Sequence, residues 1–461
     1  MSSSNREDVG IVLLLMSLVC LGTWPALLRL ASEEDPSSLL PRSENEEEEH
    51  QESSVLYVTT SSIGYSSLPP VVGAATTNHS HHIASTTNND DNPGAPAYHL
   101  ETVCHAYLDY ATAYFLVSSV PFLITVVRNT SVLSMPPLPL VATAMLGGTL
   151  LSWGNLSFQW ATAVYKASLT FVLAIQASMT IVLGTGINYG LEPHMTKRPQ
   201  WLFAGMTCFL LAIVMAVQSQ LAWMQQKAEA PNEQQPCDIE IIEYHQPNNQ
   251  QPTPGGQTAP NASTQQEKQS NSSTVVTGLV VAFLGGLCFG FFSPAFNVAV
   301  NDPFQWTIST GTGTIDDDDD KDQTLRVVRA NFIFSFAFWV ASFGGNLWLL
   351  QKKQQPQQSM PSLLRRYWLS STWMERRMAL LAGLVCAIGN VLQFQGGQLV
   401  GYATADLVQA YPLVSTVWDV LWFGEFHSLR FPSRLATMLL GMYLAYGAGV
   451  LLFAGSSVGD G

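Results

Sequence analysis

The chain alternates between long apolar stretches and long polar segments. An apolar stretch of about 18 or more residues is typical of a helix that crosses a membrane, because that length of helix matches the hydrocarbon thickness. We therefore predict an all-α integral membrane protein with about ten transmembrane helices. The ten stretches are residues 9–30, 106–127, 138–160, 163–188, 200–222, 274–300, 327–350, 378–397, 401–423 and 434–455.

Polar segments divide these helices into two groups of five. The segment 31–104 is acidic and then rich in Ser, Thr and Asn, and 223–273 is rich in Gln, Pro and Asn. Both contain too few apolar residues to offset the entropy of ordering, so we expect disordered loops. The predicted order is a first helix in 1–30, the loop 31–104, helices two to five in 105–222, the loop 223–273, helices six to ten in 274–455 with polar loops 301–326 and 351–377, and a tail at 456–461.

Composition supports a membrane protein and excludes several other classes. Hydrophobic residues make up 47% of the chain and charged residues only 12%, and the net charge of −14 comes from the polar loops. No basic patch with interleaved aromatic residues indicates nucleic-acid binding. No HExxH or GxSxG motif indicates an enzyme. The cysteines lack metal-ligand spacing, and His79, His81 and His82 fall in a polar tract, so we expect no metal site.

The two groups of helices share a sequence pattern. Gly154-Asn155, Gln176-Ala177 and Glu192 in the first group match Gly389-Asn390, Gln409-Ala410 and Glu425 in the second, and the Gln-to-Glu separation is 16 residues in both. The segment beginning at Cys20 similarly matches the one beginning at Cys288. Because each repeat would hold an odd number of helices, the two halves would be inverted relative to each other. This pattern predicts two inverted five-helix repeats, with a substrate site between them near the membrane midplane.

One predicted helix carries acidic residues within its apolar stretch. Tyr402, Asp406, Gln409 and Thr416 fall on one stripe of a helix over 401–423. Our hypothesis is that Asp406 binds a coupling proton, with Asp419 as a weaker candidate. The alternative is a structural carboxylate bonded to a neighbouring helix.

Carboxamides form the second group of candidates, because they offer both donors and acceptors to a neutral solute. The alternative is that they hydrogen-bond helices to one another. Trp24 is a candidate to stack on a planar ring or to lie at the membrane interface, and Glu192 and Glu425 are candidates for a gate or a helix-end charge. The predicted substrate-binding residues are Asn155, Gln159, Gln176, Asn297, Asn390, Gln393, Gln395, Gln398, Gln409 and Trp24. The glycine pairs 147–148, 285–286 and 396–397 are expected to be close-packing points.

With these residues in view, the chain resembles the ureide permeases. The matching stretches include Leu21-Gly-Thr-Trp-Pro-Ala26, Tyr107-Leu-Asp-Tyr110, Gly154-Asn155-Leu156, Phe291 to Asn297 with Asn301-Asp302, Gly389 to Gln409 and Phe423-Gly-Glu425. The resemblance implies a ten-helix fold similar to drug/metabolite transporters. It also implies proton-coupled uptake of allantoin, uracil, xanthine and similar oxo-heterocycles.

Two departures qualify the resemblance. The acidic insert at 31–104 is unlike the short first loop of plant members. The central loop lacks a GxxxxGK[ST] motif, so no nucleotide cofactor is expected and the proton is the predicted coupling ion.

Two other functions remain open from the sequence. Ten-helix sugar transporters of the same superfamily share much of the pattern from Gly389 to Pro412, and a sugar also suits Asn, Gln and aromatic side chains. A receptor that binds without transport is a more distant alternative. We expect a multi-pass protein of the plasma membrane whose partners are the lipid bilayer and a small polar heterocyclic solute.

Overall fold

The residues that the computed structural model describes are mainly helical and include no strand. These are 3–32, 94–128, 135–165, 167, 169–229, 263–306, 319–353, 367–368, 372–418, 422 and 434–457. The helices are α1 (Ser3–Ser32), α3 (Gly94–Arg128), α4 (Leu138–Gln159), η3 (Trp160–Val164), α5 (Leu169–Leu191), η4 (Pro193–Met195), α6 (Pro199–Glu229), α7 (Ser263–Asn301), α9 (Asp319–Lys353), α11 (Trp373–Val400), α12 (Tyr402–Ala405), η5 (Asp406–Ala410), α13 (Pro412–Trp418) and α14 (Arg434–Ser457).

Eight of the described helices are long and apolar enough to cross a membrane. They are α1, α3, α5, α6, α7, α9, α11 and α14. The helix α4 coincides with the third predicted span but is not among the eight, since glycines and polar residues dilute its apolar character. The prediction of about ten spans is therefore not confirmed in number, although an all-helical fold with several candidate membrane-spanning helices is confirmed.

The prediction of one continuous helix over 401–423 is wrong. Gly401 has a φ of 90°, a backbone conformation that side chains other than glycine rarely adopt, and it ends α11. A four-residue α-helix, a five-residue 3-10 helix and α13 follow, and Pro412 has no N–H to continue the preceding hydrogen bonding. The stripe drawn through Asp406 and Gln409 on an unbroken α-helix is consequently not the geometry observed.

Several helices extend beyond the predicted apolar stretches. The helix α3 begins at Gly94, inside the segment 31–104 that was expected to be a loop, and α7 begins at Ser263, inside 223–273. The helices α6 and α9 likewise extend into predicted loops, and α14 extends into the predicted tail. A hydropathy boundary marks the end of an apolar stretch, whereas a helix continues as long as its own backbone hydrogen bonds form. Residues 33–93 and 230–262 lie outside the described part.

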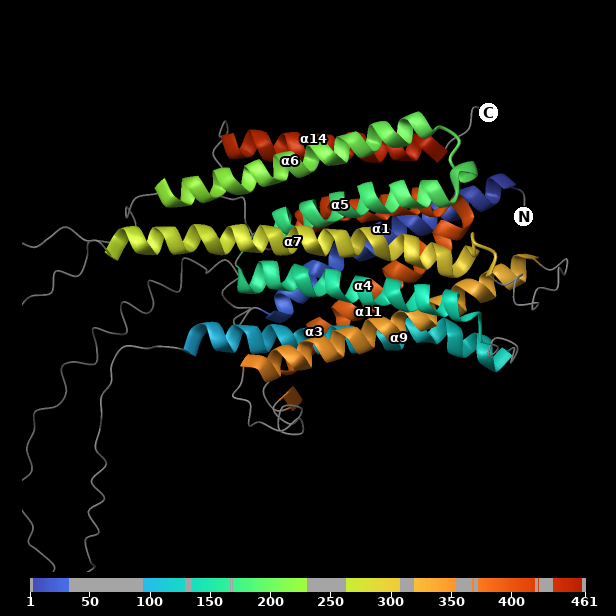
Figure 1. Ribbon diagram of the computed structural model, residues 1–461, viewed down its shortest axis with the longest axis horizontal. Coiled ribbons are helices and arrows are strands. Elements are labelled where there is room, and N and C mark those ends of the chain that lie inside the picture. The colour runs from blue at the N-terminus through green and yellow to red at the C-terminus, as the bar shows by residue number, and fades with distance from the viewer. Residues whose placement is uncertain are drawn as a thin grey trace, which may run out of the picture. The chain divides into compact units, whose positions relative to one another are not determined.

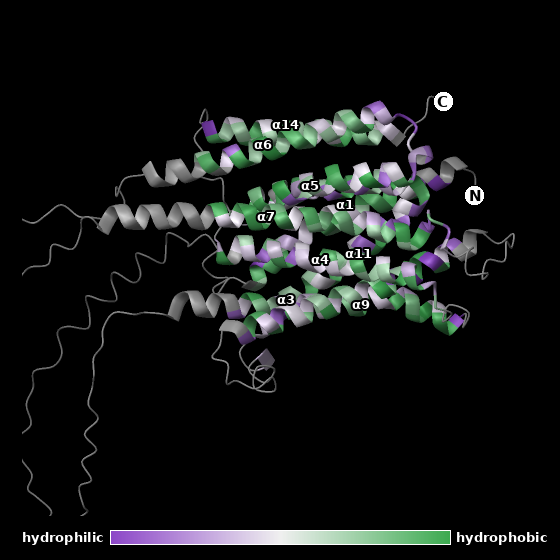
Figure 2. Cartoon of the chain, in the orientation of Figure 1, coloured by the Kyte–Doolittle hydropathy of each residue, from purple (hydrophilic) through white to green (hydrophobic). Residues whose placement is uncertain are grey.

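The long helices run side by side as a bundle (Figure 1). The helix α1 packs on α11, α4 contacts both α7 and α9, α5 contacts α6 and α7, and α6 packs on α14. Apolar residues dominate the length of these helices (Figure 2), and outward-facing ones such as Leu116, Leu284 and Leu451 are exposed. Exposed apolar side chains of this kind are expected where a helix faces lipid.

Glycines let several helix pairs approach closely, which confirms the packing role expected for the glycine pairs. A Cβ at Gly148 of α4 would lie 2.0 Å from the backbone oxygen of Phe334 in α9. A Cβ at Gly285 would lie 2.0 Å from the Oγ of Ser157, and one at Gly396 would lie 2.7 Å from Leu14. Small residues at such contacts allow van der Waals packing between membrane helices.

Replacing Gly148 by alanine should separate α4 from α9, because the added methyl group meets backbone that cannot move without the helix. We expect Gly148→Ala to lower the free energy of unfolding by about 1–3 kcal/mol. The control is Gly344→Ala in α9, where a Cβ meets nothing within 4 Å. Thermal unfolding of both purified variants in detergent measures the difference, and equal midpoints would contradict the close-packing assignment.

Candidate functional site

Most of the candidate polar side chains lie inside the bundle. The buried ones are Asn155, Gln159, Gln176, Asn297, Asn390, Gln393, Asp406 and Gln409, none of them more than 5% exposed. A polar group buried in apolar surroundings is costly unless it has a hydrogen-bond partner. The structure provides such partners in two groups, which we name the aromatic–amide cluster and the carboxamide chain.

The aromatic–amide cluster is built on three tyrosines of α3. Tyr107, Tyr110 and Tyr114 are spaced three and four residues apart, so they share one face of the helix, and all three are fully buried. Asn155 of α4 donates from Nδ2 to the hydroxyl of Tyr110 at 3.0 Å. Asn390 of α11 donates from Nδ2 to the hydroxyl of Tyr114 at 3.1 Å. Two asparagines that the sequence pattern paired across the repeats therefore converge on neighbouring tyrosines.

Trp24 of α1 and Cys386 of α11 complete this cluster. The ring centroid of Trp24 lies 5.3 Å from that of Tyr110 with a 30° tilt, and Phe158 packs edge-on against Trp24 at 5.6 Å. Tyr110 also donates its hydroxyl proton to Cys386 Sγ at 3.1 Å. Trp24 is 4% exposed and thus lies inside the bundle instead of at an interfacial belt.

Asp406 is fully buried where the chain changes from α12 to η5. Its Oδ2 accepts a hydrogen bond from Asn188 Nδ2 at 2.8 Å, and its Oδ1 accepts one from Ser293 Oγ at 2.7 Å. Gly184 lies one turn before Asn188 on α5, and a Cβ there would lie 3.1 Å from Asp406 Oδ2. The carboxylate is therefore enclosed by α5 and α7, and its hydrogen-bond donors among the described residues are neutral.

The carboxamide chain leads from Asp406 toward the ends of α5, α7 and α11. Its members are Asp406, Asn188, Asn297, Asn301 and Gln398. Asn297 Nδ2 donates to Asn188 Oδ1 at 3.1 Å, Asn301 Nδ2 to Asn297 Oδ1 at 2.8 Å, and Gln398 Nε2 to Asn301 Oδ1 at 3.0 Å.

Three further residues join the outer part of the chain. Asn301 Nδ2 also donates to Glu192 Oε1, beyond the last residue of α5. Gln398 Nε2 donates to the Tyr402 hydroxyl at 3.1 Å and its Oε1 accepts from Gln323 of α9. The chain thus joins two carboxylates, Asp406 and Glu192. Burial raises the pKa of the Glu192 carboxyl, while the hydrogen bond from Asn301 and the charge of His194 oppose this shift.

The remaining candidate glutamines occupy separate positions. Gln409 Nε2 donates to Gln393 Oε1 at 3.3 Å, joining η5 to α11. Gln176 Nε2 donates to Ser157 Oγ at 3.5 Å, joining α5 to α4. The Oε1 atoms of Gln159 and Gln176 are buried and find no hydrogen-bond partner among the described residues. Gln395 is half-buried.

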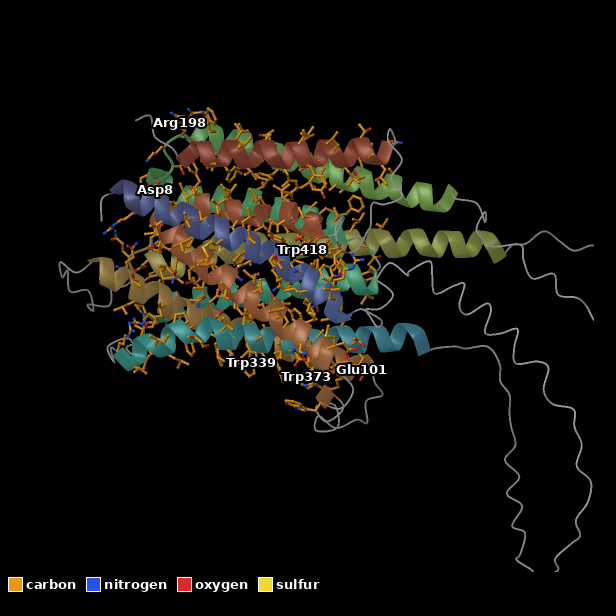
Figure 3. The ribbon with its side chains drawn as sticks, turned by 180° about the vertical axis from the view of Figure 1, so that it is seen from behind. Asp8, Glu101, Arg198, Trp339, Trp373 and Trp418 are labelled. Atoms are coloured by element: carbon orange, nitrogen blue, oxygen red, sulfur yellow. The ribbon has the colours of Figure 1, made fainter. Side chains whose placement is uncertain are left out.

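Two candidates lie outside the described residues, Asp419 and Glu425. The nearby Trp418 of α13, labelled in Figure 3, is described. Its Nε1 donates to Thr23 of α1 at 3.3 Å.

Sequence reasoning did not select Asn188, Ser293, Asn301, Tyr110, Tyr114 or Tyr402 as site residues. A signal for some of them was present, because Asn188 precedes Glu192 by four residues and Ser293, Asn297 and Asn301 repeat at the same spacing. Polar residues four apart share one face of a helix. The partner across that face could not be identified without the packing of α5 on α7.

Comparison with known proteins decides the family. The model of the ureide permease family matches residues 106–456. The chain belongs to the ureide permease family. Ureide permeases 1 and 2 of Arabidopsis thaliana are 36% and 32% identical to it, over 69% and 73% of this chain and 78% and 85% of their own lengths. A probable ureide permease A3 of Vigna unguiculata is 34% identical over 70% of this chain and 87% of its own.

No solved structure matches the chain. Family membership makes this protein a membrane transporter and not an enzyme. Membership also explains why the long helices expose apolar side chains. A ureide permease is an integral membrane protein, so the apolar outer faces of α3, α6 and α14 contact lipid.

Removing the Tyr110 hydroxyl should destabilise the aromatic–amide cluster. Tyr110→Phe leaves Asn155 Nδ2 without its acceptor, and a buried unpaired donor costs about 1–3 kcal/mol. We expect a lower unfolding temperature in detergent. Tyr189→Phe is the control, because Tyr189 contacts the ring of Phe203 and that contact survives the change. An unfolding temperature of Tyr110→Phe equal to that of the unaltered protein would show that this hydrogen bond contributes nothing measurable.

Proposed function

We propose that this ureide permease carries ureides and related oxo-heterocycles, such as allantoin, uracil and xanthine, across the plasma membrane together with protons. The observation that carries the proposal is the fully buried Asp406, bonded to Asn188 and Ser293 inside a chain that belongs to the ureide permease family. Intramembrane acids are rare, and where they occur they mark ion and proton pathways. The similar ureide permeases of Arabidopsis thaliana support ureides as the substrate class.

We assign substrate binding to the aromatic–amide cluster. Ureides and oxo-heterocycles present alternating N–H and C=O groups on a flat ring. Trp24 and Tyr110 offer aromatic faces, and the carboxamides of Asn155 and Asn390 offer both donors and acceptors. The Oε1 atoms of Gln159 and Gln176 have no hydrogen-bond partner among the described residues, so they are additional acceptors that an N–H of a solute would satisfy.

Helix packing supports two inverted repeats, which we propose give alternating access to a site between them. Interchanging the two groups of helices maps α1 onto α7 and α4 onto α11, so the contact α1–α11 corresponds to the contact α7–α4, and both occur. A Cβ at Gly154 would meet Phe289, and one at Gly389 would meet Leu21. These are the positions that the repeated sequence pattern pairs. A midplane site between such halves suits a rocking mechanism.

The first test is uptake of radiolabelled uracil and allantoin by a transport-deficient host cell at about pH 5 and about pH 7.5. We expect saturable uptake that is stronger at the lower pH and is abolished by a protonophore, because a proton gradient would drive accumulation. Uptake of a hexose or pentose instead of either solute would contradict the ureide proposal and indicate a sugar transporter. Binding in proteoliposomes without flux would indicate a receptor.

A second test separates coupling from transport. Asp406→Asn retains the shape of the side chain but cannot exchange a proton. We therefore expect it to abolish uphill accumulation while solute exchange between two loaded compartments continues. Counterflow in proteoliposomes, with and without a pH gradient, measures both activities. Equal loss of exchange and accumulation would assign Asp406 a structural role instead.

A further inference from the structure

The carboxamide chain has a single direction. Each amide uses its nitrogen to donate and its oxygen to accept, from Gln398 through Asn301, Asn297 and Asn188 to Asp406 Oδ2. Each amide in the series therefore donates one N–H along the series toward the buried carboxylate. Four amides in one orientation are not required by packing alone, since an amide can be turned over without changing its shape.

Glu192 accounts for this direction. An ionised carboxylate only accepts hydrogen bonds, so Glu192 Oε1 fixes the nitrogen of Asn301 toward itself. The oxygen of Asn301 is then left to accept from Gln398, and its nitrogen donates to Asn297. The same constraint passes to Asn188, whose nitrogen must face Asp406. Oδ2 of Asp406 is thereby held as an acceptor.

The other oxygen of Asp406 faces a group without such a constraint. Ser293 Oγ donates to Oδ1 at 2.7 Å, and a hydroxyl both donates and accepts because its hydrogen rotates. Ser293 also accepts from Asn188 Nδ2 at 3.0 Å. If a proton binds Oδ1, the hydroxyl of Ser293 can turn and accept from it without displacement of any heavy atom. The nitrogen of Asn188 cannot accept in that way.

We propose that the coupling proton binds Oδ1 of Asp406 and is held there by Ser293, while the carboxamide chain anchored on Glu192 keeps Oδ2 an acceptor. The proposal rests on the proposed function, in which Asp406 carries the proton. A hydronium ion of the aqueous compartment gives its proton to Oδ1 and becomes water. The hydrogen of Ser293 rotates away from Oδ1, and its own covalent O–H bond stays intact. Ser293, Asn188 and Glu192 are positioning residues in this step.

The other titratable groups near Asp406 do not compete for this role. Tyr402 of α12, Tyr411 after η5 and Tyr446 of α14 are phenols that ordinarily titrate near pH 10, above the range of transport. The helix α1 contributes the apolar Leu18 to the packing around η5. After Asn188, α5 carries the phenol of Tyr189, and Glu192 and His194 follow the end of the helix. The helix α7 ends next to Asp302, whose Oδ1 accepts from the Trp306 backbone.

Infrared difference spectroscopy of the protein in proteoliposomes tests which oxygen of Asp406 binds the proton. The carbonyl stretch of a protonated carboxyl, recorded between about pH 5 and about pH 7.5, is assigned to Asp406 by its loss in Asp406→Asn. We expect Ser293→Ala to move this band to higher frequency, because the O–H loses its acceptor, and Ser293→Thr to leave it in place. Asn331→Ser is the matched control. Asn331 is a buried amide that donates to the Ser118 backbone oxygen and is not a member of the carboxamide chain.

Glu192→Gln tests the anchor of the chain. Glutamine can donate as well as accept, so the amides can turn over and Asn188 can present its oxygen to a proton on Oδ2. In Glu192→Gln combined with Ser293→Ala, we therefore expect the carboxyl band to return toward its hydrogen-bonded frequency. An unchanged band in Ser293→Ala, or identical bands in the single and double variants, would overturn the assignment.

Uptake measurements give an independent reading of the same variants. Ser293→Ala removes a hydrogen bond that is stronger to the ionised than to the protonated carboxyl, so the pH of half-maximal uptake should rise by about half a unit to one unit. Ser293→Thr should retain the original value, and Ser293→Ala with an unshifted value would count against the role of Ser293. If no Asp406 band titrates at all, the proposed proton coupling fails. If it titrates but ignores Ser293, only the present inference fails.

Discussion

Hydrocarbon supplies no hydrogen-bond partner, so every polar side chain that a membrane helix carries inward must be matched by another polar group of the protein. This constraint shapes the interior of the bundle. Asn155 and Asn390 are matched by tyrosines of α3, and Asp406 is matched by an amide and a hydroxyl from two different helices. Each match fixes one helix relative to another. The polar groups that would serve transport therefore also determine how the helices pack.

Much of the fold follows from the sequence because apolar length is a strong signal. Eight long apolar helices lie where the hydropathy pattern places them, and the glycine pairs are close contacts as expected. The breaks after Ala405 and Ala410 were missed, because hydropathy reports how apolar a stretch is and not whether its backbone hydrogen bonds continue. The residues from Gly401 to Trp418 remain apolar enough to resemble a span while forming three short helices.

The candidate site was predictable in residue type but not in pairing. Asp406, Asn297 and Gln398 were selected from their polarity within apolar stretches, and the structure links them in one chain. Asn188 and Ser293 escaped selection because one polar residue on an apolar helix is common, and its importance depends on what it faces. That information resides in the contact between α5 and α7, helices that are far apart in the sequence.

The contact between α1 and α11 has a consequence for biosynthesis. Ser17 donates to the backbone oxygen of Gly389, a residue 372 positions later, and Gly10 and Gly22 of α1 fit against α11 and α13. At a synthesis rate of about 5–20 residues per second, α1 waits on the order of tens of seconds for this partner to emerge from the ribosome. During that interval Gly10 and Ser17 of α1 have no α11 to pack against, although Tyr110 and Phe158, which contact Trp24, are already made. The helix α1 is thus made long before α11, the helix with which it packs most extensively.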